Sequence, residues 1–182
     1  MKDWANQIDR LTGMFLNSFS PLSEDDLNWK PGPETWSIAE NMEHLIILNE
    51  SYFPGFERLN RGNYDLPFIA RFGFVVKFFG NLILKSVNPD RNKKMKTFPL
   101  WQPSKSNFSK EILNRFETHQ NKLKEEILST EHHIKENAVI SSPANKNIVY
   151  KLETAFEILI SHEKRHYNQA NEIYQLLKEQ KS

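Results

Sequence analysis

The chain has 182 residues, the length of one domain, so we expect a single domain over residues 1–182. Its 24 Lys and Arg residues nearly balance 23 Asp and Glu residues, which argues against nucleic acid or a membrane as the partner. The absence of cysteine excludes disulfides, zinc sites built from cysteine and a cysteine nucleophile. The N-terminal MKDWANQIDRL lacks the apolar core of a signal peptide, so a cytoplasmic protein is expected.

Two helices are predicted in the first third of the chain. The first begins near Asp3, carries apolar residues at helical spacing and stops before Pro21. The second begins at Ser37, where Ser37 and Glu40 have the spacing of a capping box. It continues through NMEHLIILNESYF, a stretch apolar enough to be buried on most sides.

Two more helices are predicted in the second half, over about 107–128 and about 150–178. The only strand candidate is the short stretch NAVISSP at 137–143, which Pro143 ends. Residues 60–106 form a long connection between the second and third helices, and we expect an extra helix inside it. A connection of that length can cross a helical bundle from end to end. The fold class is therefore all-α, a four-helix bundle with a long crossover.

The most apolar segment of the chain, FIARFGFVVKFFGNLILK at 68–85, lies inside this connection. Arg71 and Lys77, together with two glycines, argue against a membrane span. A helix or irregular segment packed on the domain is the first expectation. Its five phenylalanines make a homodimer contact plausible, and a membrane-surface element is the lesser alternative.

The last predicted helix carries an unusual polar stretch on its inward side. His162, His166 and Gln169 occupy consecutive positions of a seam that is apolar on both sides of them. His162-Glu163-Lys164-Arg165-His166 also fits H-E-x-x-H, in which the two histidines share one helix face. A divalent metal would satisfy both imidazoles, while neutral histidines bonded to carbonyls or water explain the pattern equally well.

A catalytic metal needs a third ligand, and two other histidines are candidates. His44 lies in the middle of the second helix, on the shoulder of its apolar face. His119 lies on the apolar stripe of the third helix and is a close rival. Spacing alone ranks His44 narrowly first. His132 and His133 lie in a polar stretch and are expected at the surface.

A zinc protease is not supported by the sequence around the motif. Zinc proteases of this kind take a third ligand from beyond a turn downstream, but only 16 residues follow His166 and most continue the same helix. Lys164 and Arg165 are also unusual between the two histidines, and no strand is predicted that would bind a peptide substrate.

The chain resembles the DinB-like superfamily of four-helix metalloproteins, which includes bacillithiol transferases of the YfiT type. Three motifs carry the resemblance, and together they span most of the chain. They are LNWKPGPETWSIAENMEHL at 27–45, PLWQPSKS at 99–106 and ILISHEKRHYNQ at 158–169.

The resemblance implies an up-down-down-up bundle and a metal site made by His44, His162 and His166. Zinc or nickel is the expected metal, with manganese as a further option, because imidazoles favour these ions over magnesium or calcium. A transferase is implied, in which the metal activates a low-molecular-weight thiol, bacillithiol or a similar one, for attack on an electrophile.

Glu163 and Gln169 are the candidate catalytic residues beside the metal. Glu163 is expected to act as a base or to accept a hydrogen bond near the metal, with a solvated surface carboxylate as the alternative. Gln169 is expected to orient His166 or a bound water. The alternatives to a thiol transferase are a hydrolase that uses metal-bound hydroxide and a metal-binding, stress-linked protein without catalytic activity.

Overall fold

The computed structural model describes residues 2–90 and 97–182, and most of these residues lie in helices, so the prediction of a mainly helical fold is confirmed. The helices are α1 (Trp4–Phe19), α2 (Glu24–Asn28), α3 (Ile38–Glu50), α4 (Phe53–Asn60), α5 (Gly73–Val87), α6 (Ile112–Thr130) and α7 (Leu152–Lys181). Short 3-10 helices lie at η1 (Phe68–Arg71), η2 (Pro99–Trp101) and η3 (Glu131–Ile134).

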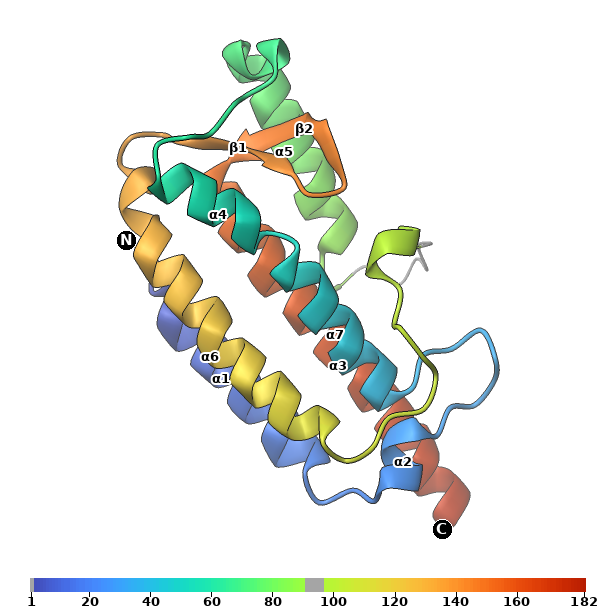
Figure 1. Cartoon of the computed structure of the whole chain (residues 1–182). Helices are drawn as coiled ribbons and strands as arrows, with labels where there is room; N and C mark the ends of the chain where they lie inside the picture. The colour runs from blue at the N-terminus through green and yellow to red at the C-terminus, as the bar shows by residue number, and fades with distance from the viewer. Residues whose placement is uncertain (1, 91–96) are drawn as a thin grey trace.

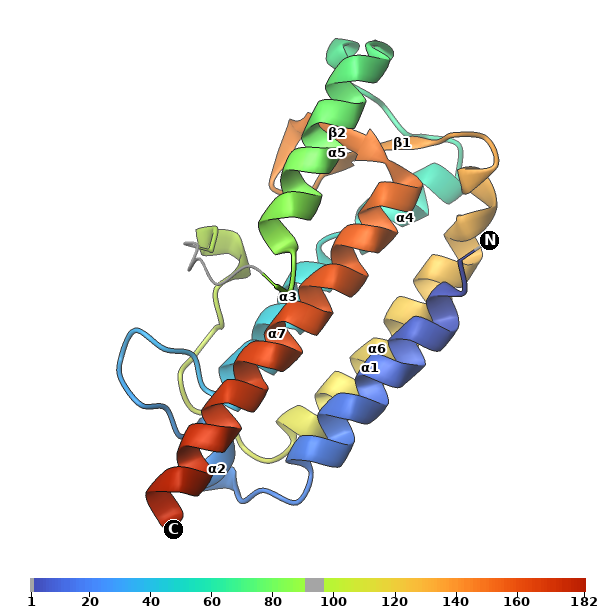
Figure 2. The ribbon, with the colours of Figure 1, turned by 180° about the vertical axis from the view of Figure 1, so that it is seen from behind.

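Four long helices lie side by side and make the body of the molecule (Figure 1). Helix α1 packs on α6 and α7, and α3 packs on α7 and α6. In Figures 1 and 2 the chain runs down along α1, up along α3, up again along α6 and down along α7. The segment between α4 and α6 therefore returns from one end of the body to the other.

The first two predicted helices form where the sequence places their starts. Helix α1 ends at Phe19, before Pro21, as predicted. Helix α3 begins after the predicted capping box, in which Ser37 Oγ accepts from the Glu40 N–H and the Glu40 carboxylate accepts from the Ser37 N–H. Its predicted continuation through 53 is wrong, because α3 ends at Glu50 and α4 starts with a proline in its first turn.

The strand prediction was incomplete. Strand β1 (Val139–Ser142) lies in the predicted stretch, but β2 (Asn145–Lys151) pairs with it antiparallel and was missed. The β-branched and aromatic run at 148–150 belongs to β2, so α7 begins at Leu152, two residues later than predicted. Helix α6 begins at Ile112, about five residues later than predicted.

The extra helix expected in the 60–106 connection is α5, which lies on β2 and α7. Gly80 allows this close approach, because a Cβ there would meet Thr154 Cγ2 at 3.1 Å. The expectation that the phenylalanine-rich segment packs on the domain holds for one face of α5 only. Phe74 and Phe78, on the other face, are 75% and 60% exposed.

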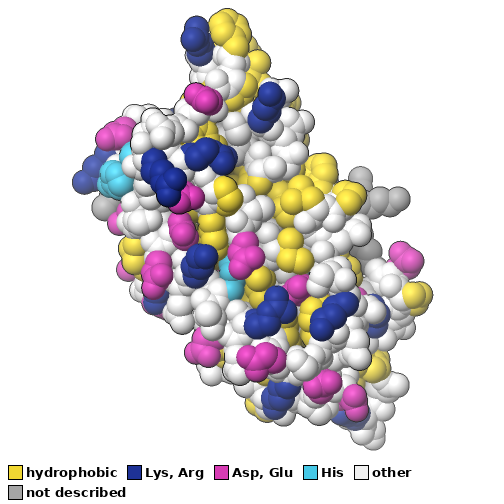
Figure 3. Space-filling view, in the orientation of Figure 1, with side chains coloured by type: hydrophobic (Ala, Val, Ile, Leu, Met, Phe, Trp, Pro, Cys, Tyr) yellow, Lys and Arg dark blue, Asp and Glu magenta, His cyan; other side chains and the backbone are white. Residues whose placement is uncertain are grey.

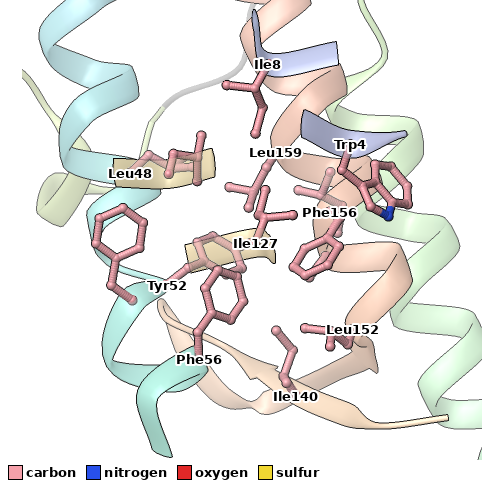
Figure 4. Packing of buried hydrophobic residues seen from close by; sticks show 14 of the residues in the cluster. Trp4, Ile8, Leu48, Tyr52, Phe56, Ile127, Ile140, Leu152, Phe156 and Leu159 are labelled. Atoms are coloured by element: carbon pink, nitrogen blue, oxygen red, sulfur yellow. The ribbon is translucent and has the colours of Figure 1, made fainter. Parts of the chain in front are cut away.

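The core consists of two apolar clusters with polar side chains between them. Figure 4 shows the first cluster, which lies toward the hairpin and includes Trp4, Leu123 and Leu159. The second lies toward the other end of α7 and includes Phe116 and Ala170. The buried polar side chains at the level between the clusters are His44, Asn49, His119, Gln120, His162, Glu163 and His166.

Within the described residues, no helix has both the length and the apolar character needed to span a membrane.

The start of α3 fixes the position of His44, which lies two turns further along, so the capping box is a test of this part of the fold. We expect Ser37→Ala to lower the free energy of unfolding by about 1–2 kcal/mol, because it leaves a buried N–H without an acceptor. Urea unfolding followed by circular dichroism measures the change. Thr12→Ala is the control, because its hydroxyl bonds only a carbonyl of its own helix, and a loss as large as that of Ser37→Ala would contradict the explanation.

Candidate metal centre

Three histidines from two helices meet in the layer between the apolar clusters. His44 comes from α3, and His162 and His166 come from successive turns of α7. The Nε2 atom of His162 lies 3.4 Å from Nε2 of His44 and 3.1 Å from Nε2 of His166. Each residue offers one nitrogen, all within 4.8 Å of one another, and the three side chains are buried. This arrangement can hold a metal ion.

Hydrogen bonds fix which nitrogen of two of these rings carries the proton. His44 Nδ1 lies 2.6 Å from the carbonyl oxygen of Trp101, which can only accept. His166 Nδ1 lies 2.7 Å from Asn41 Oδ1. The Asn41 amide is itself oriented, because its Nδ2 donates to the carbonyl of Ser37. Both rings therefore donate from Nδ1 and turn the lone pair of Nε2 toward the common centre.

Burial keeps all three imidazoles neutral. It lowers the pKa of His44 to about 4, and it lowers the pKa values of His162 and His166 well below 6.5. The neighbouring histidines and Arg165 add to this effect for the two residues of α7. At neutral pH each ring therefore carries a single proton. His44 and His166 hold theirs on Nδ1, so their Nε2 atoms are unprotonated.

The third ring shows why a cation fits the site. His162 Nδ1 is buried and has no hydrogen-bond partner among the described residues. If the proton of His162 is on Nδ1, the three Nε2 atoms face one another as bare lone pairs. If it is on Nε2, the lone pair of Nδ1 is buried without a donor. A divalent ion accepting the three Nε2 lone pairs removes their mutual repulsion, and a set of three imidazoles suits zinc or nickel.

The rival third ligand, His119, takes a different position. It is buried, stacks on Phe53 at 5.8 Å between ring centroids and receives a hydrogen bond from Asn49 Nδ2 at 3.2 Å. The structure thus brings His44, and not His119, to the pair on α7. His132 is exposed and His133 half-buried, so neither approaches this centre.

Glu163 is not at the surface, so the alternative of a solvated carboxylate is wrong. Its side chain is fully buried, and its Oε1 accepts hydrogen bonds from Asn49 Nδ2 and Gln120 Nε2, both at 2.8 Å. Its Oε2 has no partner among the described residues. Burial raises the pKa of Glu163 to about 7, although the two hydrogen bonds act in the opposite direction.

Gln169, the other candidate catalytic residue, is half-buried one turn beyond His166. It was expected to orient His166 or a bound water, and the structure shows that His166 Nδ1 bonds to Asn41. The role of Asn41 was not predicted, although it lies inside the 27–45 motif, three residues before His44. The role of the Trp101 carbonyl was not predicted either, since a backbone group leaves no signal in the sequence.

Arg165 lies between the two histidines in the sequence of α7, but its side chain reaches the end of α5. It is buried, and its Nη1 donates to the carbonyl oxygens of Ser86 and Asn88 at 3.1 and 3.3 Å. These carbonyls lie at the end of α5, where helical carbonyls lack partners within the helix. Arg165 thus links α7 to the C-terminal end of α5 through two hydrogen bonds.

A family model for the DinB superfamily matches residues 7–170. The chain belongs to the DinB superfamily. The match covers all three histidines, the whole of α3 and α7 as far as residue 170. No curated protein and no solved structure matches the chain. Membership in this superfamily and the buried histidine cluster together fit a metal-binding protein.

The hydrogen bond from His166 to Asn41 generates a test of metal affinity. Asn41→Leu keeps a side chain of similar size but removes the acceptor, so the His166 ring loses its fixed orientation. We expect zinc affinity to fall about 10- to 100-fold, measured by competition with a chromophoric chelator. Asn114→Leu, at an exposed position of α6, is the control, and equal affinities for the two variants would refute the role of Asn41.

The buried carboxyl of Glu163 generates a test of pH dependence. Its folded pKa of about 7 lies above the ordinary value of 4.5, so the folded state binds more protons than the unfolded state between these values. The free energy of unfolding of the metal-free protein should therefore fall as pH rises through this window. Glu163→Gln removes that loss, and we expect it to be more stable than the wild type at pH about 8 by about 1–3 kcal/mol, but not at pH about 5.

The measurement is urea unfolding of the metal-free wild type and variant at both pH values. Glu172→Gln, at an exposed position of α7, is the matched control and should leave the pH profile unchanged. A stability difference between Glu163→Gln and wild type that is the same at both pH values would show that the carboxyl does not titrate in this window.

Proposed function

We propose that this chain is a divalent-metal-dependent transferase that activates a low-molecular-weight thiol, bacillithiol or one like it, for attack on an electrophile. The observation that carries the proposal is the convergence of three neutral imidazoles, with two of their tautomers fixed by hydrogen bonds. We further propose that residues 1–182 form one domain and that α1, α3, α6 and α7 are its up-down-down-up bundle.

The metal ligands in this proposal are His44, His162 and His166. A divalent ion bound to them supplies a Lewis acid, which lowers the pKa of a thiol or water that reaches it. The chain has no cysteine, so the thiol has to come from a second substrate. Zinc and nickel are the favoured ions for such a ligand set.

Two tryptophans lie near the histidines, Trp36 through its ring and Trp101 through its backbone carbonyl. The Trp36 ring lies 4.8 Å from the His44 ring and 5.9 Å from the His166 ring between centroids, and it is half-buried. Trp101 Nε1 donates to Ser51 Oγ at 3.0 Å, which ties η2 to the end of α3. We assign the Trp36 ring the role of limiting water around the histidines and offering an apolar surface to the electrophile.

Glu163 and Gln169 have different roles in the proposal. Glu163 can take up a proton at Oε2, the carboxylate oxygen that no donor occupies, and its raised pKa suits a group that gains and loses a proton near pH 7. Gln169 is half-buried one turn beyond His166 on α7. We propose Glu163 as the proton acceptor and Gln169 as a substrate-binding residue.

The first experiment is elemental analysis of the purified protein and four histidine variants. We expect about one zinc or nickel ion per chain, lost in His44→Ala and in His166→Ala because each removes one of three ligands. His132→Ala is the surface control and His119→Ala tests the rival ligand, and both should retain the metal. Loss of metal in His119→Ala but not in His44→Ala would overturn the ligand set.

The second experiment tests the reaction with the metal-loaded protein. Monobromobimane serves as a fluorogenic electrophile, offered with bacillithiol, cysteine, glutathione or coenzyme A, and we expect acceleration above the uncatalysed rate for one of these thiols only when metal is present. Ester hydrolysis without thiol would favour a hydrolase instead. Stoichiometric metal with no turnover in either assay would leave a metal-binding protein without catalytic activity.

A further inference from the structure

Helix α5 has one packed face and one exposed apolar face. Val76 and Gly80 are buried, and Gly80 lies against Tyr150 of β2 and Thr154 of α7. On the opposite side Phe74, Phe78 and Leu82 follow one another at intervals of four residues, and they are 75%, 60% and 50% exposed. Side chains of this size are seldom left so exposed in a row on a monomeric protein, so this face calls for a partner.

The apolar face continues onto η1, just before α5. Phe68 and Phe72 are 66% and 41% exposed, and Phe72 lies 5.5 Å from Phe68 and 6.0 Å from Phe74 between ring centroids. The Arg71 guanidinium lies 5.2 Å from the Phe68 ring centroid. We refer to the five exposed residues as the α5 apolar surface: Phe68, Phe72, Phe74, Phe78 and Leu82.

The α5 apolar surface includes the part of the molecule that projects farthest from the bundle. In Figures 1 and 2 the first turns of α5 and the preceding η1 extend beyond the strands and the ends of the long helices. Figure 3 shows apolar atoms and cationic side chains next to one another on this projecting end. The surface is thus convex, which suits contact with a broad surface better than enclosure of a peptide or a small molecule.

The charge around the α5 apolar surface indicates which kind of partner surface would bind to it. Arg71, Lys77 and Lys85 are exposed beside the apolar residues, and residues 66–87 contain no acid. The wider stretch 66–97 holds seven Lys or Arg residues and one acid, Asp90, whereas the rest of the chain holds 17 Lys or Arg and 22 acids. Residues 91–96, which read RNKKMK, contribute four of those cations but lie outside the described residues, so the α5 apolar surface is defined without them.

We propose that the α5 apolar surface docks on a lipid bilayer that carries anionic headgroups. A helix with Phe and Leu on its exposed face and Lys or Arg beside them binds at the membrane interface, and anionic lipid strengthens the contact. A second copy of the chain fits less well, because a two-fold contact sets the patch that carries Arg71, Lys77 and Lys85 against the same basic patch of the other copy. The metal centre takes no part in this contact, so this proposal is independent of the proposed reaction.

The test is sedimentation with sucrose-loaded vesicles, using the metal-loaded 182-residue chain. One set of vesicles is phosphatidylcholine alone, and the other contains phosphatidylcholine and phosphatidylglycerol in equal parts. We expect binding to the anionic vesicles that is at least about ten-fold stronger than to the neutral ones and that weakens as salt is added. Each cation near an anionic surface is worth about a factor of five in binding, so Lys77→Glu alone should produce a measurable loss.

The apolar contribution is tested with the double variant Phe74→Ser and Phe78→Ser. Both side chains are largely exposed in the free protein, so the variant should fold, and we expect it to lose at least about ten-fold in vesicle binding. Leu128→Ser is the matched control, because Leu128 is 47% exposed on α6 and lies outside the surface. Circular dichroism and metal content confirm that each variant is intact.

Four results would overturn the proposal. Three of them concern vesicles: no binding at all, equal binding to neutral and anionic vesicles, or unchanged binding of the Phe74→Ser and Phe78→Ser variant to anionic vesicles. The fourth is a dimer, detected by light scattering, that becomes a monomer in this variant. The last result would assign the surface to a second copy. Binding of a fluorescent single-stranded oligonucleotide without vesicle binding would likewise assign the charge to nucleic acid.

Discussion

The centre of the bundle depends on three buried, neutral imidazoles whose Nε2 atoms face one another, and hydrogen bonds at Nδ1 direct the Nε2 lone pairs of His44 and His166 toward the common centre. Lone pairs of His44, His162 and His166 held within a few ångströms repel one another unless a cation or a proton lies between them, and burial disfavours the proton. This layer adds little to the stability of the metal-free chain. The apolar clusters on both sides of it therefore supply the packing that keeps α3 and α7 at a fixed separation.

The groups that orient the imidazoles extend the site well beyond its ligands. Asn41 lies one turn before His44 on α3, whereas Trp101 lies in the long connection that returns from α4 to α6. The Trp101 carbonyl can accept this hydrogen bond whatever the side chain at position 101, provided that the connection runs close to His44 Nδ1. The connection is thus more than a link between helices, because one of its residues sets the direction of His44.

The sequence alone predicted that His162 and His166 lie on the same side of the last helix, because residues four apart share a helix face. Spacing ranked His44 only narrowly above His119, because the choice depends on distances between helices, and it was the family resemblance that implied His44. Asn41 was missed because an amide inside an apolar run looks like an ordinary flank position. Strand β2 was missed because its apolar run continues without a break into the periodic pattern of α7.

Residues 162–166 of α7 contact three different helices, because side chains along a helix are rotated by about 100° per residue. His162 and His166 face α3, Glu163 reaches donors on α3 and α6, and Arg165 holds the end of α5. Lys164 alone among the five is exposed. The helix is buried on several sides along this stretch, so the polar residues of the motif bond to groups on α3, α5 and α6.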